Sequence, residues 1–218
     1  YMLLGPLRHR FTALERAKEQ GIGHYFVPRY TRVVDTAESK DNINKAYNLI
    51  STSKVRNEMI IDDVITCVAR KQTPVILTRF KEHAKFLHDA LKKKADHVFL
   101  LYGDNSDKEN AEIRVKLKQI PENESLILVA TGQKIGEGFD FPRLDVLMLA
   151  APVSFEGRLE QYVGRLNRDY VGKEAVYVYD YIDSHVRYFD KMYAKRLRTY
   201  RKMGFSIWTQ ELQPKQII

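Results

Sequence analysis

The sequence predicts an α/β domain built on a parallel β-sheet that is covered by helices on both faces. The first observation is a set of short apolar runs with the length of buried strands, at 74–78, 97–102, 125–131, 146–150 and 175–182. These runs are continuously apolar rather than alternating, as in strands that are buried on both sides. The second observation is that segments of helical length separate the runs, and strands that alternate with helices build parallel sheets.

Five segments with apolar residues at helical spacing are expected to be the helices, at 54–71, 82–93, 107–120, 155–168 and 184–203. In the first of them the apolar side chains recur on one face; they are Ile60, Ile61, Val64, Ile65 and Val68. Cys67 lies in the same helix and is expected to be a core residue rather than a reactive thiol. Because ligands of such sheets bind beyond the carboxyl ends of the strands, functional side chains are expected directly after strands.

The chain is expected to have three parts. Residues 1–53 read as a leading linker segment, residues 54–183 as the α/β domain, and residues 184–218 as a basic helix with a tail. Within the linker segment, residues 24–34 read as extended chain. Pro28 predicts a sheet edge there, because proline cannot donate a hydrogen bond to a neighbouring strand.

Composition limits the classes of protein to which the chain can belong. The chain carries 36 Lys and Arg against 28 Asp and Glu, a formal net charge of +8, and a positive charge favours polyanionic partners. The single cysteine excludes an internal disulfide and fits a reducing, cytoplasmic compartment. No apolar run reaches about 18 residues, so no membrane contact is expected, and residues 1–10 lack the apolar core of a signal peptide.

Much of the positive charge lies in the expected helix at 184–203, which has seven Lys or Arg and one acid, Asp190. Five of the cations fall within about 80° on a helical wheel; they are Arg187, Lys191, Lys195, Arg198 and Lys202. Apolar side chains form a second face of the same helix. The basic stripe fits contact with a phosphate backbone, and it equally fits a solvated helix face, so both interpretations stay open.

The stretch 161–168 reads QYVGRLNR and is predicted to be helical. At about 100° per residue, Gln161, Arg165 and Arg168 fall on one narrow face, opposite the apolar residues of the stretch. Gly164 is unusual, since glycine in a helix interior costs about 1 kcal/mol relative to alanine. It suggests that another backbone or a ligand approaches closely. Two arginines beside a gap suit a polyphosphate, because a guanidinium binds phosphate oxygens in pairs and stays charged. A solvated surface helix is the alternative.

A second candidate site lies at 130–142, ATGQKIGEGFDFP, where an apolar strand leads into a loop with three glycines. Glycine lets backbone amides approach a phosphate or a ribose closely. Thr131 ends the strand with a hydroxyl and an amide that suit a phosphate. Asp140 follows Gly138 by two residues, where its carboxylate can accept hydrogen bonds from hydroxyl groups. Taken alone, the same residues also fit a flexible loop.

Together the two segments resemble motifs V and VI of superfamily 2 helicases. They have the family's order: a strand that ends in Ala-Thr, a loop with Gly-x-Asp, another strand and then QxxGRxxR. The stretch 75–80, VILTRF, is similar to motif IV, and LYG at 101–103 resembles the next family element. The resemblance covers about residues 73–182. It implies that the chain has a RecA-like fold and that it is the C-terminal motor domain of a DEAD/DEAH-type helicase.

Gln161 also bears on the branch of the family. The RNA-acting DEAD-box members commonly have histidine at this position, so glutamine favours the DNA-acting members. The segments at both ends of the chain are similar to those of bacterial repair- or restriction-type helicases. The resemblance therefore implies a nucleic-acid partner, with DNA favoured over RNA.

The resemblance implies roles for five residues in an ATP site between two domains. Arg165 and Arg168 match the motif VI arginines that reach the γ-phosphate of ATP bound to the partner domain. Gln161 matches the residue that helps to couple that site. Gly138 and Asp140 match the motif V positions at the interdomain nucleotide site. An arginine finger of this kind is worth about 10³–10⁵ in rate.

The resemblance also implies contacts with the nucleic-acid backbone. Thr131 and Gly132 match the motif V positions that contact it, and Thr78 and Arg79 lie where motif IV approaches it. None of these positions implies a metal ligand in this chain.

The other half of an ATP site is absent from the sequence. No phosphate-cradling GxxxxGK[ST] loop is present, and Asp62-Asp63 falls inside an expected helix rather than after a strand. The chain is therefore expected to be the second domain of a two-domain motor, whose N-terminal RecA-like domain holds ATP and Mg²⁺. Alone, it is not expected to hydrolyse ATP. The alternative function is a non-catalytic RecA-like module that binds nucleic acid or a protein.

Overall fold

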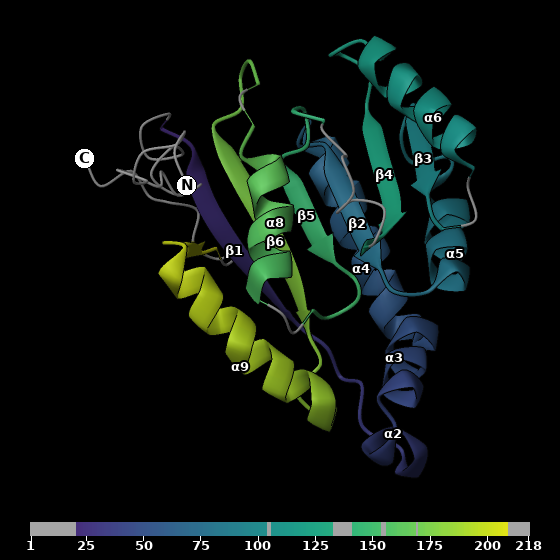
Figure 1. The fold of residues 1–218 in the computed structure, drawn as a ribbon, viewed down its shortest axis with the longest axis vertical. Helices are drawn as coiled ribbons and strands as arrows, with labels where there is room; N and C mark the ends of the chain where they lie inside the picture. Colours follow the sequence, from purple (N-terminus) through teal and green to yellow (C-terminus); the bar gives the residue numbers. More distant parts are fainter. Residues whose placement is uncertain (1–20, 104–105, 133–140, 154–155, 169, 209–218) are drawn as a thin grey trace, which may run out of the picture.

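The structure is a computed structural model, and it describes residues 21–103, 106–132, 141–153, 156–168 and 170–208 (Figure 1). Within these residues the strands form one seven-stranded sheet in the order β3-β4-β2-β5-β6-β1-β7. Every pairing between neighbouring strands is parallel. The strands are β1 (Gly23–Tyr30), β2 (Pro74–Thr78), β3 (His97–Leu101), β4 (Leu126–Thr131), β5 (Val146–Leu149), β6 (Ala175–Ile182) and β7 (Ser206–Ile207).

Helices cover both faces of the sheet, as predicted. The helices are α2 (Ala37–Asp41), α3 (Ile43–Thr52), α4 (Lys54–Ala69), α5 (Lys81–Leu91), α6 (Asp107–Gln119), α8 (Glu156–Leu166) and α9 (Arg187–Lys202). On one face, α4 and α5 pack through Val64 and Leu87. On the other face, α6, α8 and α9 pack through Leu117, Val163 and Tyr200. The predicted parallel α/β architecture is therefore confirmed.

A third apolar cluster joins α3 to the first turn of α9 and to the chain that follows β5. Its buried members include Tyr47 and Ile50 of α3, Ala151 after β5, and Phe189 of α9. The cluster matters for the site because it fixes two helices next to the loop that leads from β5 towards α8.

The expected helix at 155–168 ends earlier than predicted. The helix α8 ends at Leu166, and Arg168 lies beyond it. The Lys173 ammonium group donates hydrogen bonds to the carbonyl oxygens of Leu166 at 2.8 Å and Arg168 at 3.1 Å, and also to that of Pro142. A cation at this place satisfies carbonyl groups that the end of a helix leaves without partners.

The segment expected to be a linker contributes a strand to the sheet. All eight residues of β1 pair with β6, while β7 pairs only with Tyr25 and Phe26. The Trp208 amide donates to the Phe26 carbonyl at 2.7 Å, so the backbone polar groups of Phe26 point away from β6. Because this direction alternates along a strand, the backbone nitrogen of Pro28 points the same way, beyond the end of β7. The missing N–H of Pro28 therefore interrupts no ladder. The expected division at residue 53 falls between α3 and α4 and does not separate β1 from the sheet.

No helix in the part of the chain that the structure describes is long and apolar enough to cross a membrane.

Candidate functional site

A cleft of about 1380 Å³ lies at the carboxyl ends of the strands and contains all four residues predicted to contact nucleic acid. Thr78 and Arg79 reach it from the end of β2, Thr131 and Gly132 from the end of β4, and Gln161 from the exposed side of α8. The four strand-end residues come together because β2 and β4 are parallel neighbours, with Thr78 opposite Thr131. The topology thus gathers positions that are about 50 to 80 residues apart in sequence into one wall.

Cations outnumber acids among the residues that line this cleft. Arg79, Lys81 and Arg158 contribute three positive charges, and Glu82 contributes one negative charge. Lys81 and Arg158 were missed by the sequence analysis, because neither belongs to a recognisable motif. Arg158 lies three residues before Gln161 on α8, so its helical spacing was the signal that could have found it.

The guanidinium group of Arg79 rests on an aromatic ring. Its central carbon lies 4.4 Å from the centre of the Tyr47 ring, and one of its nitrogens donates to the Asn44 side chain at 3.4 Å. Burial raises the pKa of Tyr47, and nearby cations, with Arg79 first among them, act against that rise. Arg79 is exposed on its other side, so the ring orients a cation that still faces the cleft.

Thr78 takes part in the cleft wall differently from what its motif implies. Its side chain is buried, and its hydroxyl donates to the Phe80 carbonyl at 3.1 Å, at the start of α5. The hydroxyl proton is therefore used inside the protein. Thr131 is only half-buried at the end of β4.

Gly132 is held against the side chain of Tyr162. The Tyr162 hydroxyl donates to the Gly132 carbonyl at 2.9 Å, and a Cβ atom added at Gly132 would lie 2.7 Å from that hydroxyl oxygen. No other residue type fits this position without movement of the ring. The contact couples the end of β4 to α8, so the two segments that carry the family resemblance are also in physical contact.

The face of α8 that was predicted to be apolar is buried. Leu159, Tyr162, Val163 and Leu166 are at most 4% exposed. Gln161 is exposed on the other side, and Arg165 is half-buried. Each of these two side chains has an interaction within the protein.

Gly164 lies on the same outer side of α8 as Gln161. The sequence suggested that another backbone or a ligand approaches this glycine. Among the described residues, no atom lies within 4 Å of a Cβ placed there. Within the described part of the chain, the outer surface of α8 is therefore open at this position.

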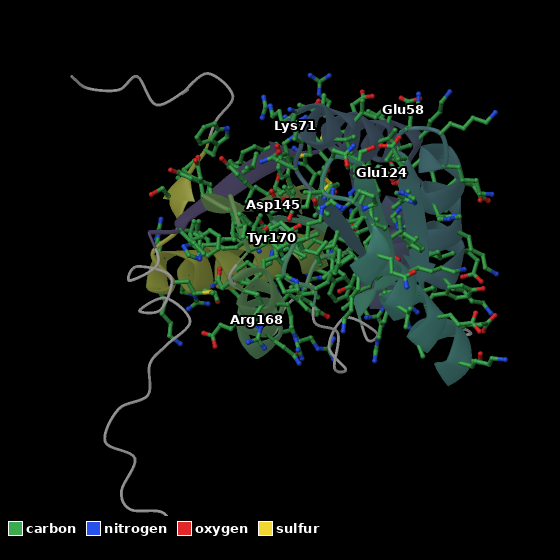
Figure 2. All side chains as sticks on the ribbon, turned by 90° about the horizontal axis from the view of Figure 1, so that it is seen from above. Glu58, Lys71, Glu124, Asp145, Arg168 and Tyr170 are labelled. Carbon is green, nitrogen blue, oxygen red and sulfur yellow. The ribbon has the colours of Figure 1, made fainter. Side chains whose placement is uncertain are left out.

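The structure does not bring Arg165 and Arg168 into the strand-end cleft. The helix α8 runs antiparallel to the strands, so Arg168 lies near the amino edge of the sheet, where Lys173 binds its carbonyl oxygen. In Figure 2, Arg168 lies on the side of the sheet opposite to Glu58 and Lys71. Arg168 is exposed, and it also has an interaction within the protein.

The last residue of the turn before Arg168 is tied to the first strand. The amide oxygen Oδ1 of Asn167 accepts a hydrogen bond of 2.7 Å from the Nε2 of His24. Burial lowers the pKa of His24, so the ring is neutral at pH 7 and Nε2 donates to the amide oxygen. Gly138 and Asp140, the predicted nucleotide contacts, lie outside the described residues.

Two buried ion pairs lie beneath the cleft, and the sequence analysis missed both. Arg56 binds Asp183 in a bidentate pair at 2.9 and 3.1 Å, and Arg196 binds Asp180 at 2.7 and 2.9 Å. All four side chains are at most 2% exposed. The sequence could have indicated these pairs through the aspartates in and directly after the apolar strand β6, because a buried carboxylate requires a partner.

The same arginines hold the chain that follows β5. Arg56 also donates to the Ala150 carbonyl at 2.8 Å, and Arg196 to the Val153 carbonyl at 3.1 Å. Between them, the Tyr47 hydroxyl donates to the Pro152 carbonyl at 2.7 Å. Side chains from α3, α4 and α9 thus fix three carbonyl groups on the way from β5 to α8. Arg196 belongs to the seven cations of the basic helix, and its burial removes it from the basic surface.

Of the two acids in Asp62-Asp63, Asp63 has a structural role. Asp63 lies in α4, where it binds Arg29 at 2.8 Å and accepts a hydrogen bond from the Tyr181 hydroxyl at 3.1 Å. Cys67 of the same helix is fully buried, and burial raises the pKa of its thiol to about 12. Within the described ranges, no group of three or more His, Cys, Asp or Glu side chains could hold a metal ion.

No model of a known protein family matches the chain. Among curated proteins, it is 28% identical over 172 residues to the transcript termination protein A18 of Yaba-like disease virus, covering 74% of this chain and 35% of that protein. It is 34% identical over 118 residues to the putative helicase 161L of Invertebrate iridescent virus 6, covering 53% of this chain and 22% of that protein. The chain thus spans about a third or less of the length of these relatives.

Solved structures share the fold. T4 UvsW matches with a TM-score of 0.65 at 20% identity, over 86% of this chain and 41% of UvsW. A DEAD box protein from Methanococcus jannaschii matches with a TM-score of 0.51 at 17% identity, over 87% of this chain and 42% of that protein. The predicted RecA-like fold is confirmed. The sequence relatives named above are viral, so they lend no support to the bacterial branch.

Proposed function

We propose that this chain is the C-terminal RecA-like motor domain of an ATP-dependent nucleic-acid helicase or translocase. The observation that carries the proposal is the cleft at the strand ends. It gathers Thr131, Gly132 and Arg79 with Gln161 of α8, and cations outnumber acids among its lining residues. The similarity to a putative viral helicase and to viral transcript termination proteins supports the same function.

The outer side of α8 fits a polyphosphate that is presented by another domain. Gly164 leaves this surface open, and Arg165 and Arg168 lie one residue and four residues further along the chain. In the proposal these arginines would neutralise charge on the phosphoryl oxygens, and Gly138 and Asp140 would bind the nucleotide from the loop before β5. Bound ATP would supply the phosphoryl group that is transferred to water, and an N-terminal RecA-like domain would hold the ATP and its Mg²⁺.

The cleft residues and the two arginines lie at different positions along α8, because Gln161 is near the middle of the helix and Arg168 lies beyond its end. Gln161 faces the cleft at the carboxyl edge of the sheet, and Arg168 lies near the amino edge. The helix is rigidly packed between them, with its apolar side fully buried. In the proposal, α8 and the Tyr162–Gly132 contact couple the nucleotide site to the nucleic-acid site.

DNA is retained as the proposed nucleic acid because of Gln161. A hydrolysis assay with single-stranded DNA, double-stranded DNA and RNA, each at several concentrations, would test this choice. Stimulation by RNA alone would overturn it and leave the motor function in place.

The test of the motor function is ATP hydrolysis by the full-length protein, with and without nucleic acid. We expect Arg168→Ala and Arg165→Ala to lower the stimulated rate by about 10² or more, because each removes charge from the phosphoryl-transfer site. Arg114→Ala, at an exposed arginine on α6, is the matched control and should leave the rate unchanged. A full rate in Arg168→Ala would refute the assigned role, and a wild-type protein that binds nucleic acid without hydrolysing ATP would instead be a binding module.

The substitution Gly164→Ala tests whether the glycine is required for stability or for ATP hydrolysis. Alanine should stabilise the helix by about 0.5–1 kcal/mol, because the added methyl group meets no side chain or neighbouring segment among the described residues. The same methyl group would obstruct a phosphate or backbone from another domain. We therefore expect a higher midpoint of urea unfolding together with a lower rate of hydrolysis. A stabilised variant with a full hydrolysis rate would show that nothing approaches Gly164 in the working enzyme.

A further inference from the structure

We propose that the exposed basic face of α9 extends the nucleic-acid path out of the strand-end cleft. This face consists of Arg187, Lys191, Lys195, Arg198 and Lys202, all of which are exposed. The inference rests on the proposed function. It adds a contact surface outside the helicase motifs and predicts that the bound strand is longer than the cleft alone.

The helix that carries this face is firmly anchored. Phe189 and Tyr200 are buried beneath it, and Arg196 is paired with Asp180 inside the protein. The helix therefore holds the backbone positions of these cations in place against the domain. Asp190, the acid of this helix, lies about 60° from Arg187 on a helical wheel, but about 100° from Lys191 and about 140° from Lys195, on the side opposite to Met192.

The basic face begins beside the cleft. Met192 of α9 lines the cleft, and its sulfur lies 3.7 Å from the Tyr47 hydroxyl. Lys195 lies about 60° around the helix from Met192, on the side where the stripe runs. The cleft contributes cations of its own, including Arg79 and Arg158. A polyanion that leaves the cleft over Met192 therefore reaches the stripe without crossing an acidic surface of α9.

The spacing of the cations suits a phosphate backbone. Arg187 and Lys202 are fifteen residues apart, which is about 22 Å along a helix at 1.5 Å per residue. Along the axis of a duplex the phosphates of one strand recur about every 3.4 Å, so the face has the length of about six base pairs. Lys202, at the far end, binds Glu160 of α8 at 3.2 Å. The cations between the two ends, Lys191, Lys195 and Arg198, are therefore expected to contribute most.

The test is equilibrium binding of a labelled single-stranded oligonucleotide, measured by fluorescence anisotropy at several salt concentrations. The variant Lys191→Ala/Lys195→Ala/Arg198→Ala of the full-length protein should bind at least about tenfold more weakly at low salt. The slope of log K against log salt should be smaller by up to about 2, since each contact with a single strand contributes about 0.7. Lengthening the oligonucleotide should strengthen binding to the wild type more than to this variant.

The matched control is Lys92→Ala/Lys93→Ala/Lys94→Ala, at the end of α5. These three lysines are exposed, and their replacement changes the net charge by the same amount. We expect this control to bind with nearly wild-type affinity and slope. Equal weakening in both triple variants would mean a general effect of net charge and would overturn the inference. If the α9 triple variant unfolds at a lower temperature than the wild type, Lys191→Gln/Lys195→Gln replaces it in the same assay.

Two further outcomes separate this inference from the proposed function. If Arg79→Ala weakens binding and the α9 variant does not, the path ends at the cleft and the motor function stands. If the α9 variant keeps its full affinity for nucleic acid and loses binding to an acidic protein, the face is a protein-docking surface and the inference is wrong. Failure of ATP hydrolysis in the wild type would count against the proposed function alone.

Discussion

At the scale of single residues, the contact between Gly132 and Tyr162 is the tightest constraint on the site. A Cβ atom at position 132 would lie 2.7 Å from the Tyr162 hydroxyl oxygen, which is itself bonded to the Gly132 carbonyl. We predict that Gly132→Ala lowers the free energy of unfolding by about 1–3 kcal/mol, because the buried ring must move. Tyr162→Phe removes the hydroxyl and should cost about 1 kcal/mol.

The double variant Gly132→Ala/Tyr162→Phe provides the decisive comparison. With the hydroxyl gone, the nearest remaining ring atom lies 3.6 Å from the new Cβ, an ordinary contact. In urea unfolding, the double variant should therefore lose less free energy of unfolding than the sum of the losses in the two single variants. Strict additivity would mean that the alanine is strained by something other than Tyr162.

At the scale of elements, the buried pair of Arg196 and Asp180 connects α9 and β6 to the loop after β5. Asp180→Asn should lower the free energy of unfolding by about 3–5 kcal/mol, because it leaves the Arg196 charge buried without its partner. Replacement of both residues by Leu and Met removes both charges and should recover part of that loss, although the buried Tyr200 hydroxyl then loses the Asp180 carboxylate that accepts its hydrogen bond at 3.1 Å. The Val153 carbonyl, however, loses the donor at 3.1 Å that holds it.

Thermal stability and affinity for nucleic acid should therefore respond differently to the double replacement. We expect the thermal midpoint to return towards that of the wild type, whereas affinity for nucleic acid stays reduced, because the loop that leads to α8 is no longer fixed. Recovery of both properties would mean that the pair stabilises the fold and has no role in positioning the cleft.

Individual elements differ in how well the sequence predicted them. The bounds of the strands at 74–78 and 175–182 agree with prediction, because apolar runs of that length between turns are typical of buried strands. The end of α8 was wrong by two residues, since its cap comes from Lys173 beyond the helix. The pairing of Arg56 with Asp183 spans 127 residues, and no local pattern can report such a contact.

The candidate site was predictable to the extent that topology follows from local pattern. Thr131 and Arg79 follow strands, and parallel strands bring such positions to one edge. Tyr47 and Arg158 were missed because neither belongs to a recognisable motif, and they reach the cleft from α3 and α8, which the apolar clusters hold in place. At the scale of the molecule, the cleft is therefore a product of three apolar clusters together, two on the faces of the sheet and one across its carboxyl edge.

Stability against pH is also a property of the whole molecule, and two buried groups act on it in opposite directions. His83 is buried with its Nε2 2.8 Å from the Asn57 side-chain oxygen, and burial, with a smaller contribution from Arg56, lowers its pKa to about 3. Between pH 6.5 and 3 the unfolded chain therefore binds a proton that the folded chain does not. The free energy of unfolding should fall by up to about 1.4 kcal/mol per pH unit in this range from His83 alone.

His83→Gln should remove this part of the acid sensitivity, because the amide keeps a donor towards Asn57 and does not titrate.

Asp145 changes the free energy of unfolding in the opposite direction as the pH falls. Burial raises the pKa of its carboxyl group to about 6, although the Thr73 amide donates to it at 2.7 Å. Between pH 6 and 4 the folded chain holds a proton that the unfolded chain lacks, so this group should add at most about 3 kcal/mol as the pH falls.

Urea unfolding at pH 7, 6, 5 and 4 separates the two groups when each variant is compared with the wild type. The curve for His83→Gln should be flatter than that of the wild type below pH 6.5. The curve for Asp145→Asn should be higher at pH 7 and should fall more steeply below pH 6, because asparagine keeps the hydrogen bond from Thr73 without a buried charge. Parallel curves for either variant and the wild type would mean that the group titrates alike in the folded and unfolded chain, and that its burial is relieved by water.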